Sequence, residues 1–164
     1  MIGYLALGSN LGDRYAALCA ASRALAKTEG IKIVGESPVY ETVPEGNAPH
    51  PLYLNRVVRV ETSLDARQVL EACLDIERAM GRVRPADGSK SARVIDIDLL
   101  LLGDQIIHEP GLTVPHPALL SRPFVRIPLA DVAVVGLRHP QSGDALDRSS
   151  PDPGVRRWKG RPCG

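Results

Sequence analysis

Apolar residues along the first hundred positions form two kinds of pattern, short continuous runs and runs with helical spacing. The runs 2–7 and 94–102 are short and strongly apolar, which is typical of buried strands. Between residues 13 and 30, and again from 63 to 81, apolar residues recur every three or four positions, which indicates amphipathic helices. The predicted order is strand 2–7, helix 13–30, strand 31–40, strand 53–60, helix 63–81 and strand 94–102. This βαββαβ order is that of an α+β, ferredoxin-like fold, in which an antiparallel sheet carries two helices on one face.

Proline and glycine interrupt this pattern. Residues 41–52 are predicted to be irregular, because proline removes backbone donors and restricts its neighbours. Residues 82–92 read as a second polar loop. After residue 103 the chain is punctuated by proline, and short helices are expected at 116–120 and 123–131.

The composition is that of an ordinary globular domain, with 44% hydrophobic and 24% charged residues. A formal net charge of +1 gives no global reason to bind nucleic acid or an anionic membrane, so neither is expected as a partner. The chain opens on an apolar strand pattern without a basic leader, and no apolar run is long enough to span a bilayer. We therefore expect a cytoplasmic protein.

A length of 164 residues suits one domain, which we place at 1–138. Residues 139–164 are rich in proline, glycine, serine and arginine and are expected to form a loosely ordered tail. Cys19 and Cys73 fall on apolar helix faces, where reduced, buried thiols are expected.

Two acidic residues stand in the strongest strand pattern of the chain. Asp96 and Asp98 are two positions apart, so a strand directs both side chains to one face. The apolar residues Ile95, Ile97 and Leu99 would then enter the core. Two neighbouring carboxylates are costly to desolvate without a cation, and magnesium sites that hold ATP commonly use one or two carboxylates. The plainer alternative, two surface aspartates on an edge strand, is disfavoured by the flanking apolar residues.

Basic residues cluster just before this strand. Arg82 and Arg84 follow the second predicted helix, and Lys90 and Arg93 precede Asp96. Guanidinium groups suit phosphate oxygens because their donors form a planar fork. A solvated basic loop at a helix C-terminus is the alternative, and it is favoured for Arg82 and Arg84 taken alone. Because Arg93, Lys90 and two aspartates follow closely, a phosphate-binding role for these arginines competes with the solvated loop as an interpretation.

Aromatic and polar residues elsewhere could hold a planar ligand. Tyr53 and Asn55 share one strand face, so they could stack on a heterocycle and hydrogen-bond its edge; a core tyrosine with a structural asparagine is the alternative. His116 could bind a phosphate or stabilise a turn, and Phe124 could simply pack in the core. The segment 8–12, Gly-Ser-Asn-Leu-Gly, lacks the ending of a Walker motif and the spacing of a dinucleotide fingerprint, so neither is inferred.

Six segments, taken together and in order, resemble a known family. They are LALGSNLGDR, SPVYETVPEG, YLNRVV, IERAMGRVR, ARVIDIDLLLLG and LTVPHPALLSRPFVRIPL. On these segments the chain resembles the 6-hydroxymethyl-7,8-dihydropterin pyrophosphokinases. The resemblance implies a ferredoxin-like fold, in agreement with the predicted order. It also implies an ATP-dependent diphosphokinase of folate biosynthesis, which transfers pyrophosphate from ATP to the pterin hydroxymethyl oxygen and releases AMP.

The resemblance also implies roles for individual residues. Asp96 and Asp98 would bind two Mg²⁺ ions, with ATP as co-substrate, and Arg82 and Arg93 would complete the catalytic group. The pterin would be held by Thr42, Val43, Pro44, Tyr53, Asn55 and Phe124, and the nucleotide by Glu77, Arg84, Leu99, Thr113, His116 and Arg122. ATP and the reduced pterin are the expected partners of a monomer. The general base stays open between an aspartate ligand and a hydroxyl acidified by the metal.

Some positions depart from the family pattern. Ala92 and Lys90 stand where many members have a proline and an aromatic residue, and Gly111 stands where some have an arginine. These differences concern the loop 85–92 and one nucleotide contact. A non-catalytic ligand-binding module and a metal-dependent phosphohydrolase are the rival interpretations, and both explain less than the ordered resemblance does.

Overall fold

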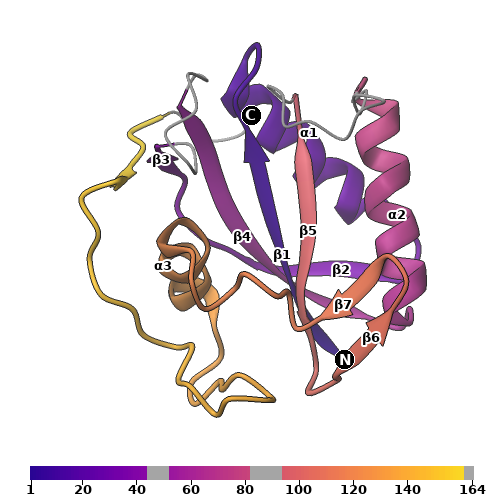
Figure 1. Cartoon of the computed structure of the whole chain (residues 1–164). Coiled ribbons are helices and arrows are strands. Elements are labelled where there is room, and N and C mark those ends of the chain that lie inside the picture. Colours follow the sequence, from indigo (N-terminus) through magenta and orange to yellow (C-terminus); the bar gives the residue numbers. More distant parts are fainter. Residues whose placement is uncertain (44–51, 82–93, 161–164) are drawn as a thin grey trace.

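An antiparallel sheet forms the centre of the computed structural model, which describes residues 1–43, 52–81 and 94–160 (Figure 1). Its helices are α1 (Arg14–Ala26), α2 (Ala66–Ala79) and α3 (Pro123–Val132), and its strands are β1 (Ile2–Ser9), β2 (Ile31–Glu36), β3 (Tyr40–Thr42), β4 (Tyr53–Thr62), β5 (Asp96–Leu102), β6 (Ile107–Glu109), β7 (Leu112–Val114) and β8 (Val155–Arg157). Within the described residues the sheet order is β5-β1-β4-β3-β8, with β2 also pairing with β4. β6 and β7 form a separate hairpin.

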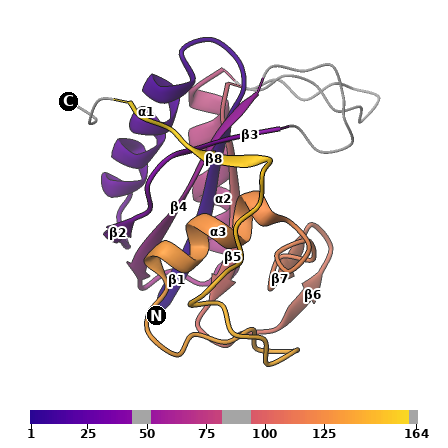
Figure 2. The same ribbon diagram turned by 90° about the vertical axis from the view of Figure 1, so that its left-hand side faces the viewer.

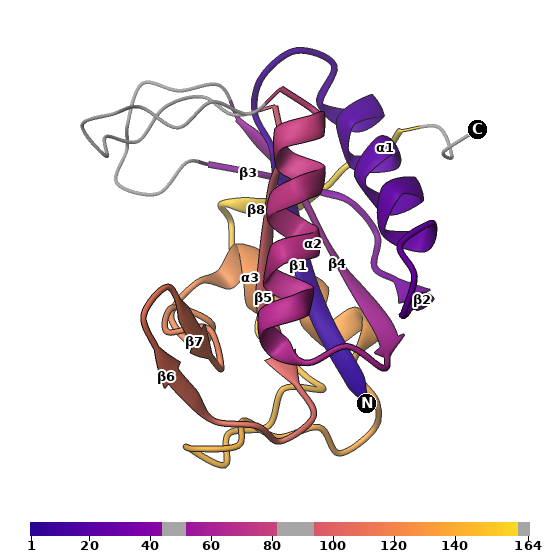
Figure 3. The same ribbon diagram turned by 90° about the vertical axis from the view of Figure 1, so that its right-hand side faces the viewer.

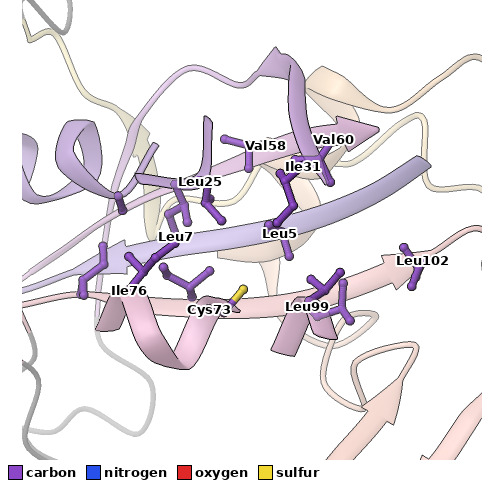
Figure 4. Packing of buried hydrophobic residues seen from close by; sticks show 14 of the residues in the cluster. Leu5, Leu7, Leu25, Ile31, Val58, Val60, Cys73, Ile76, Leu99 and Leu102 are labelled. Carbon is purple, nitrogen blue, oxygen red and sulfur yellow. The ribbon is translucent and has the colours of Figure 1, made fainter. Parts of the chain in front are cut away.

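Helices cover both faces of the sheet. α1 and α2 lie on one face, as the predicted order requires, and α3 lies on the other, which we call the α3 face (Figures 2 and 3). β1 is buried on both sides: Leu5 and Leu7 pack in the cluster that includes α1 and α2, whereas Tyr4 packs in the cluster that includes α3. In Figure 4, Cys73 and Ile76 of α2 lie beside β5 and close to β1. The sheet therefore separates two apolar layers.

Local sequence signals set the ends of the helices. The carboxylate of Asp65 accepts the Gln68 N–H at 2.8 Å, and the Gln68 side chain accepts the Asp65 N–H at 2.9 Å, which forms a capping box at the start of α2. Gly81 follows α2 with a φ of +87°, a conformation that glycine adopts without strain. Asp13 caps α1 by accepting the Ala16 N–H at 3.1 Å. No helix in the described ranges is long and apolar enough to cross a membrane.

The prediction of a single strand at 31–40 is wrong, because this segment is divided into β2 and β3. At the break, the Ser37 N–H donates to the Val57 carbonyl, and the Val57 N–H donates to the Ser37 hydroxyl, both at 2.9 Å. Pro38 follows and has no N–H with which to continue a ladder. Both parts still pair with β4.

The region after residue 103 matches the sequence predictions only in part. The helix expected at 123–131 is present as α3, but the helix expected at 116–120 is absent, and residues 117–121 form consecutive turns. In these turns the Leu119 N–H donates to the His116 carbonyl at 3.1 Å, and the Ser121 N–H donates to the Ala118 carbonyl at 3.2 Å. These bonds join residues three apart, so the backbone forms tight turns and lacks the bonds between residues four apart that define an α-helix.

The C-terminal segment 139–160 packs against the rest of the protein. β8 pairs with β3, Leu146 is only 1% exposed, and the His139 ring accepts the N–H groups of Gln141 and Ser142. This packing differs from the loosely ordered tail that the composition predicts. A strand that joins a sheet by its backbone needs few apolar side chains, so composition is a poor guide to it.

The two cysteines on helices differ in state. Cys73 is a free thiol that is 1% exposed, as predicted, and burial, with smaller effects from Glu77 and Asp98, raises its pKa to about 12. Cys19 takes part in a disulfide bond, so the prediction of a reduced thiol is wrong there. Helical periodicity shows which face is buried, but it does not show which distant segment covers that face.

Candidate active site

Asp96 and Asp98 begin β5 and project from the α3 face. Asp96 lies opposite Gly8 of β1 and Asp98 opposite Ala6, which packs in the α3 cluster, and both aspartates are half-buried. Ile97, which lies between the two aspartates, packs toward α1 and α2 on the other face. The predicted alternation is therefore confirmed. Leu99, expected near the nucleotide, has its side chain in the core on the opposite face from the aspartates.

Glu77 of α2 supports the strand that carries the aspartates. Its side chain is 3% exposed, and its Oε2 accepts the backbone N–H of Ile97 at 2.8 Å. Among the strands that the structure describes, β5 pairs with β1 alone, so this carboxylate supplies an acceptor on the other side of β5. Glu77, which the sequence predicted near the nucleotide, thus makes a structural contact with the residue that separates the two aspartates.

Across β1 from the aspartates, β4 brings Tyr53 and Asn55 to the same face. Gly8 lies between Asp96 on one side and Asn55 on the other. The Asn55 side-chain amide donates to the hydroxyl of Thr42, with 2.5 Å between Nδ2 and Oγ1, and Thr42 is 2% exposed. This bond leaves the carbonyl oxygen of the Asn55 amide turned toward Gly8.

Sequence reasoning missed the role of Gly8. A Cβ at this position would lie 2.8 Å from the Asn55 Oδ1 and 3.6 Å from the Tyr53 ring. The space beside the amide therefore depends on the absence of a side chain at residue 8. The available signal was a glycine inside an apolar strand, which often marks the close approach of a ligand or another chain segment.

Three residues that follow β7 extend the site: His116 and Arg122 lie between β7 and α3, and Phe124 lies in the first turn of α3. The His116 N–H donates to the Leu100 carbonyl at 2.9 Å, which fastens this segment to β5. Burial lowers the pKa of His116, and the charge of Arg122 lowers it further, while Asp96 acts in the opposite direction. The Arg122 guanidinium lies 5.6 Å from the centre of the Phe124 ring. A histidine, an arginine and an aromatic ring are thus placed beside the acidic strand.

The protonation of His116 follows from its hydrogen bond. Its Nδ1 accepts the Ala118 N–H at 3.1 Å. Because Nδ1 is an acceptor, the neutral ring carries its proton on Nε2, an assignment made from the hydrogen-bond network. The ring can therefore donate a hydrogen bond from Nε2 without being charged.

The remaining predicted residues have different outcomes. Thr113 lies in β7, paired with His108, and Val43 is 51% exposed directly after Thr42. Four predicted residues lie outside the described part of the chain: Pro44, Arg82, Arg84 and Arg93. The structure thus brings Thr42, Tyr53, Asn55, Asp96, Asp98, His116 and Arg122 to one region of the sheet.

The donors on the α3 face fit a hard divalent cation that keeps other ligands. Asp96 and Asp98 provide carboxylate oxygens, and the described residues contain no group of three or more histidine, cysteine, aspartate or glutamate side chains arranged to hold a metal. An ion held here would complete its shell with water and phosphate oxygens. Magnesium binds ATP in this way, whereas structural zinc sites use four protein ligands.

The fold and this face define an α+β protein with a ferredoxin-like order of elements. On the α3 face, paired carboxylates lie across β1 from Tyr53 and Asn55, which suit a planar ligand. Residues 4–134 match the family described as 7,8-dihydro-6-hydroxymethylpterin-pyrophosphokinase (HPPK), and the chain belongs to this family. The match confirms the resemblance seen in the sequence. It also confirms the predicted ferredoxin-like fold, the ATP-dependent pyrophosphokinase activity and the place in folate biosynthesis.

Known proteins support the assignment along most of the chain. A 2-amino-4-hydroxy-6-hydroxymethyldihydropteridine pyrophosphokinase from Methylorubrum extorquens is 42% identical over 130 residues, which are 79% of this chain and 81% of that protein. The protein of the same name from Bacillus subtilis is 35% identical over 96% of this chain and 90% of its own length. A crystal structure of HPPK-DHPS from Plasmodium falciparum superimposes with a TM-score of 0.63 at 17% identity, covering 79% of this chain and 40% of that one. At that identity the superposition supports the fold alone.

Proposed function

We propose that the α3 face, where β1, β4 and β5 meet, is the site at which this pyrophosphokinase transfers pyrophosphate from ATP to 6-hydroxymethyl-7,8-dihydropterin. The observation that carries the proposal is the register of Asn55, Gly8 and Asp96 across three strands. It places a hydrogen-bonding amide and a carboxylate on one face, on either side of a residue without a side chain.

The pterin would lie on the Asn55 side of Gly8. Tyr53 and Phe124 provide aromatic faces for stacking, and Asn55 provides an amide for the edge of the heterocycle. The bond to Thr42 fixes the orientation of that amide. A preoriented amide recognises one arrangement of donors and acceptors, which favours a pterin over other flat molecules.

The triphosphate would lie on the Asp96 side. Asp96 and Asp98 would hold two Mg²⁺ ions, whose charge would offset that of the phosphates. The Nε2–H of His116 and the guanidinium of Arg122 can donate hydrogen bonds to phosphate oxygens. Arg82 and Arg93 are proposed to stabilise the charge that develops during transfer, and Arg84 and Thr113 to surround the nucleotide. The side chains of Glu77 and Leu99 are buried behind β5, so we propose that they support the strand that holds the nucleotide rather than touch the nucleotide itself.

The chemical step is an in-line displacement at the β-phosphorus of ATP. The pterin hydroxymethyl oxygen forms a bond to this phosphorus, while the bond to the oxygen that bridges the α- and β-phosphates breaks. The hydroxyl proton passes to one of the two aspartates or, if the metal acidifies the hydroxyl, to water. AMP leaves with that oxygen. The residues named here act by positioning and by electrostatic stabilisation rather than by covalent catalysis. We further propose that the enzyme acts as a monomer in the cytoplasm, with its catalytic residues inside 1–138.

The experiment is a nucleotide-product assay with ATP, magnesium and the reduced pterin. AMP should form in step with pterin pyrophosphate, and ADP as the product would contradict the proposal. Asp96→Asn and Asp98→Asn should each remove most magnesium-dependent turnover. Asp104→Asn is the matched control, because Asp104 is exposed in the turn after β5. Unchanged turnover in both site variants would contradict the metal assignment.

A further inference from the structure

Arg14, the first residue of α1, contacts two segments that are distant in sequence. Its Nη1 donates to the Glu41 carboxylate at 2.9 Å and to the Leu52 carbonyl at 2.8 Å. Glu41 belongs to β3, and Leu52 directly precedes β4. The Arg14 and Glu41 side chains are 23% and 24% exposed, so their ion pair is shielded from much of the solvent. One guanidinium thus joins the end of β3 to the start of β4.

The C-terminal segment completes this contact. The Arg14 guanidinium lies 5.4 Å from the centre of the Trp158 ring, within the range of a cation–π interaction. The backbone N–H of Trp158 donates to the Val39 carbonyl at 2.8 Å, which holds this part of the C-terminal segment beside the start of β3. Trp158 also packs against the core on the side of α1 and α2. The arginine is therefore held between a carboxylate, a carbonyl and an aromatic face.

The joined residues stand next to the residues of the proposed pterin site. Glu41 precedes Thr42, which accepts the hydrogen bond from Asn55, and Leu52 precedes Tyr53. Side chains alternate along a strand, so Glu41 faces α1 while Thr42 lies on the opposite face. Glu41 is paired with Leu54, which packs in the α1 and α2 cluster, in agreement with this orientation. Arg14 thus acts from behind the sheet.

We propose that Arg14 is a positioning residue for pterin binding, and that Trp158 holds its guanidinium in place. The inference rests on the proposed function, because it assigns Thr42, Tyr53 and Asn55 to the pterin. Arg14 fixes the distance between the residues that precede Thr42 and Tyr53. Without it, β3 keeps its pairing with β4, but the end of the pair that carries the ligand contacts loses its brace.

The test compares Arg14→Ala with Arg23→Ala, a control that removes the same charge from an exposed position on the same helix. Arg14→Ala should raise the KM for the pterin by about tenfold, with kcat and the KM for ATP within about twofold of the wild type. Arg14→Lys should recover part of this loss, since an ammonium can still bridge a carboxylate and a carbonyl. Arg23→Ala should behave as the wild type.

A second measurement is independent of substrates. Trp158 is the only tryptophan of the chain, so its fluorescence reports on the contact with Arg14 directly. Acrylamide should quench this fluorescence more strongly in Arg14→Ala than in Arg23→Ala. If quenching is equal in both variants, or if both KM values rise together with a lower Tm, the positioning role is wrong. A wild-type protein that forms no AMP would instead overturn the proposed function while the quenching result stands.

Discussion

The carboxylate of Glu77 accepts the backbone N–H of Ile97 at 2.8 Å, at the residue that separates Asp96 from Asp98. Both partners are nearly inaccessible to solvent, with exposures of 3% and 4%. A buried acidic side chain on α2 thereby fastens the edge strand on which both proposed metal ligands stand. Because this bond links α2 to β5, we expect a substitution of Glu77 to displace Asp96 and Asp98 and to weaken magnesium binding.

Glu77→Ala should destabilise the protein and weaken magnesium-dependent activity together. The substitution leaves the Ile97 N–H without its acceptor, which costs about 1–3 kcal/mol. Chemical denaturation measures the loss of stability, and magnesium titration of turnover measures the effect on the site. Glu77→Gln is the control, because its amide oxygen can still accept the bond and should retain more stability. Equal stability of the alanine variant and the wild type would contradict this role.

Gly8→Ala should weaken pterin binding more than ATP binding. The new methyl would lie 2.8 Å from the Asn55 Oδ1, closer than such contacts normally are, so the amide must turn. We expect the KM for the pterin to rise by about tenfold or more, as it does when an orienting hydrogen bond is lost. Gly35→Ala in β2 is the matched control, since its nearest neighbour would be Arg59 at an ordinary 3.5 Å. Similar KM values for the two variants would refute the role of Gly8.

Tyr40 should give the stability of the protein an alkaline dependence. Burial, followed by the hydrogen bond to Asp131 and the charge of that residue, raises the pKa of Tyr40 to about 12 from 10.0. The fold favours the protonated phenol, so its contribution is complete below pH 10 and is lost as the pH rises through about 12. The loss of stability above pH 10 should be smaller in Tyr40→Phe. The difference in tyrosinate absorbance between the two proteins should develop near pH 12, and development near pH 10 would contradict the prediction.

Proline scanning of β8 should show that its backbone ladder braces β3. The Val43 N–H donates to the Gly154 carbonyl at 3.2 Å, and Glu41 is paired with Arg156. Since bonded pairs alternate in an antiparallel ladder, the N–H of Arg156 points to β3 and that of Arg157 points away. Arg156→Pro should cost about 1 kcal/mol or more and speed hydrogen exchange in β3.

Arg157→Pro is the control for this experiment. Both arginines are exposed, and both variants lose one positive charge. A proline on an edge strand is tolerated where its nitrogen faces solvent. Arg157→Pro should therefore keep exchange rates in β3 near those of the wild type. If the two variants exchange equally, β8 does not brace β3.

The sequence predicted those features that depend on neighbouring residues. The alternation from Ile95 to Leu99 placed Asp96 and Asp98 on one face, and the structure confirms it. The spacing from residue 63 to 81, with Asp65 at the start and glycine at the end, predicted α2. The ordered segments identified the family, because side-chain identity at fixed spacing is a property of the sequence itself.

The sequence predicted least well where distant segments meet. Nothing in residues 139–160 indicated that β8 would join β3, because backbone pairing leaves little trace in composition. The strand predicted at 31–40 was divided at Pro38, where the hydroxyl of Ser37 takes the place of a backbone partner. Cys19 has the periodicity of a buried thiol, yet it takes part in a disulfide bond, which helical spacing does not reveal.

The sequence by itself therefore determined the order of the elements, the shared face of Asp96 and Asp98, and the family. Only the tertiary structure decided that Gly8 separates Asn55 from Asp96 and that Arg14 joins β3 to β4. Periodicity follows from the geometry of one strand or helix, which a few neighbouring residues fix. The register between strands and the choice of distant partners arise only when the whole chain packs, because they depend on which surfaces are buried together.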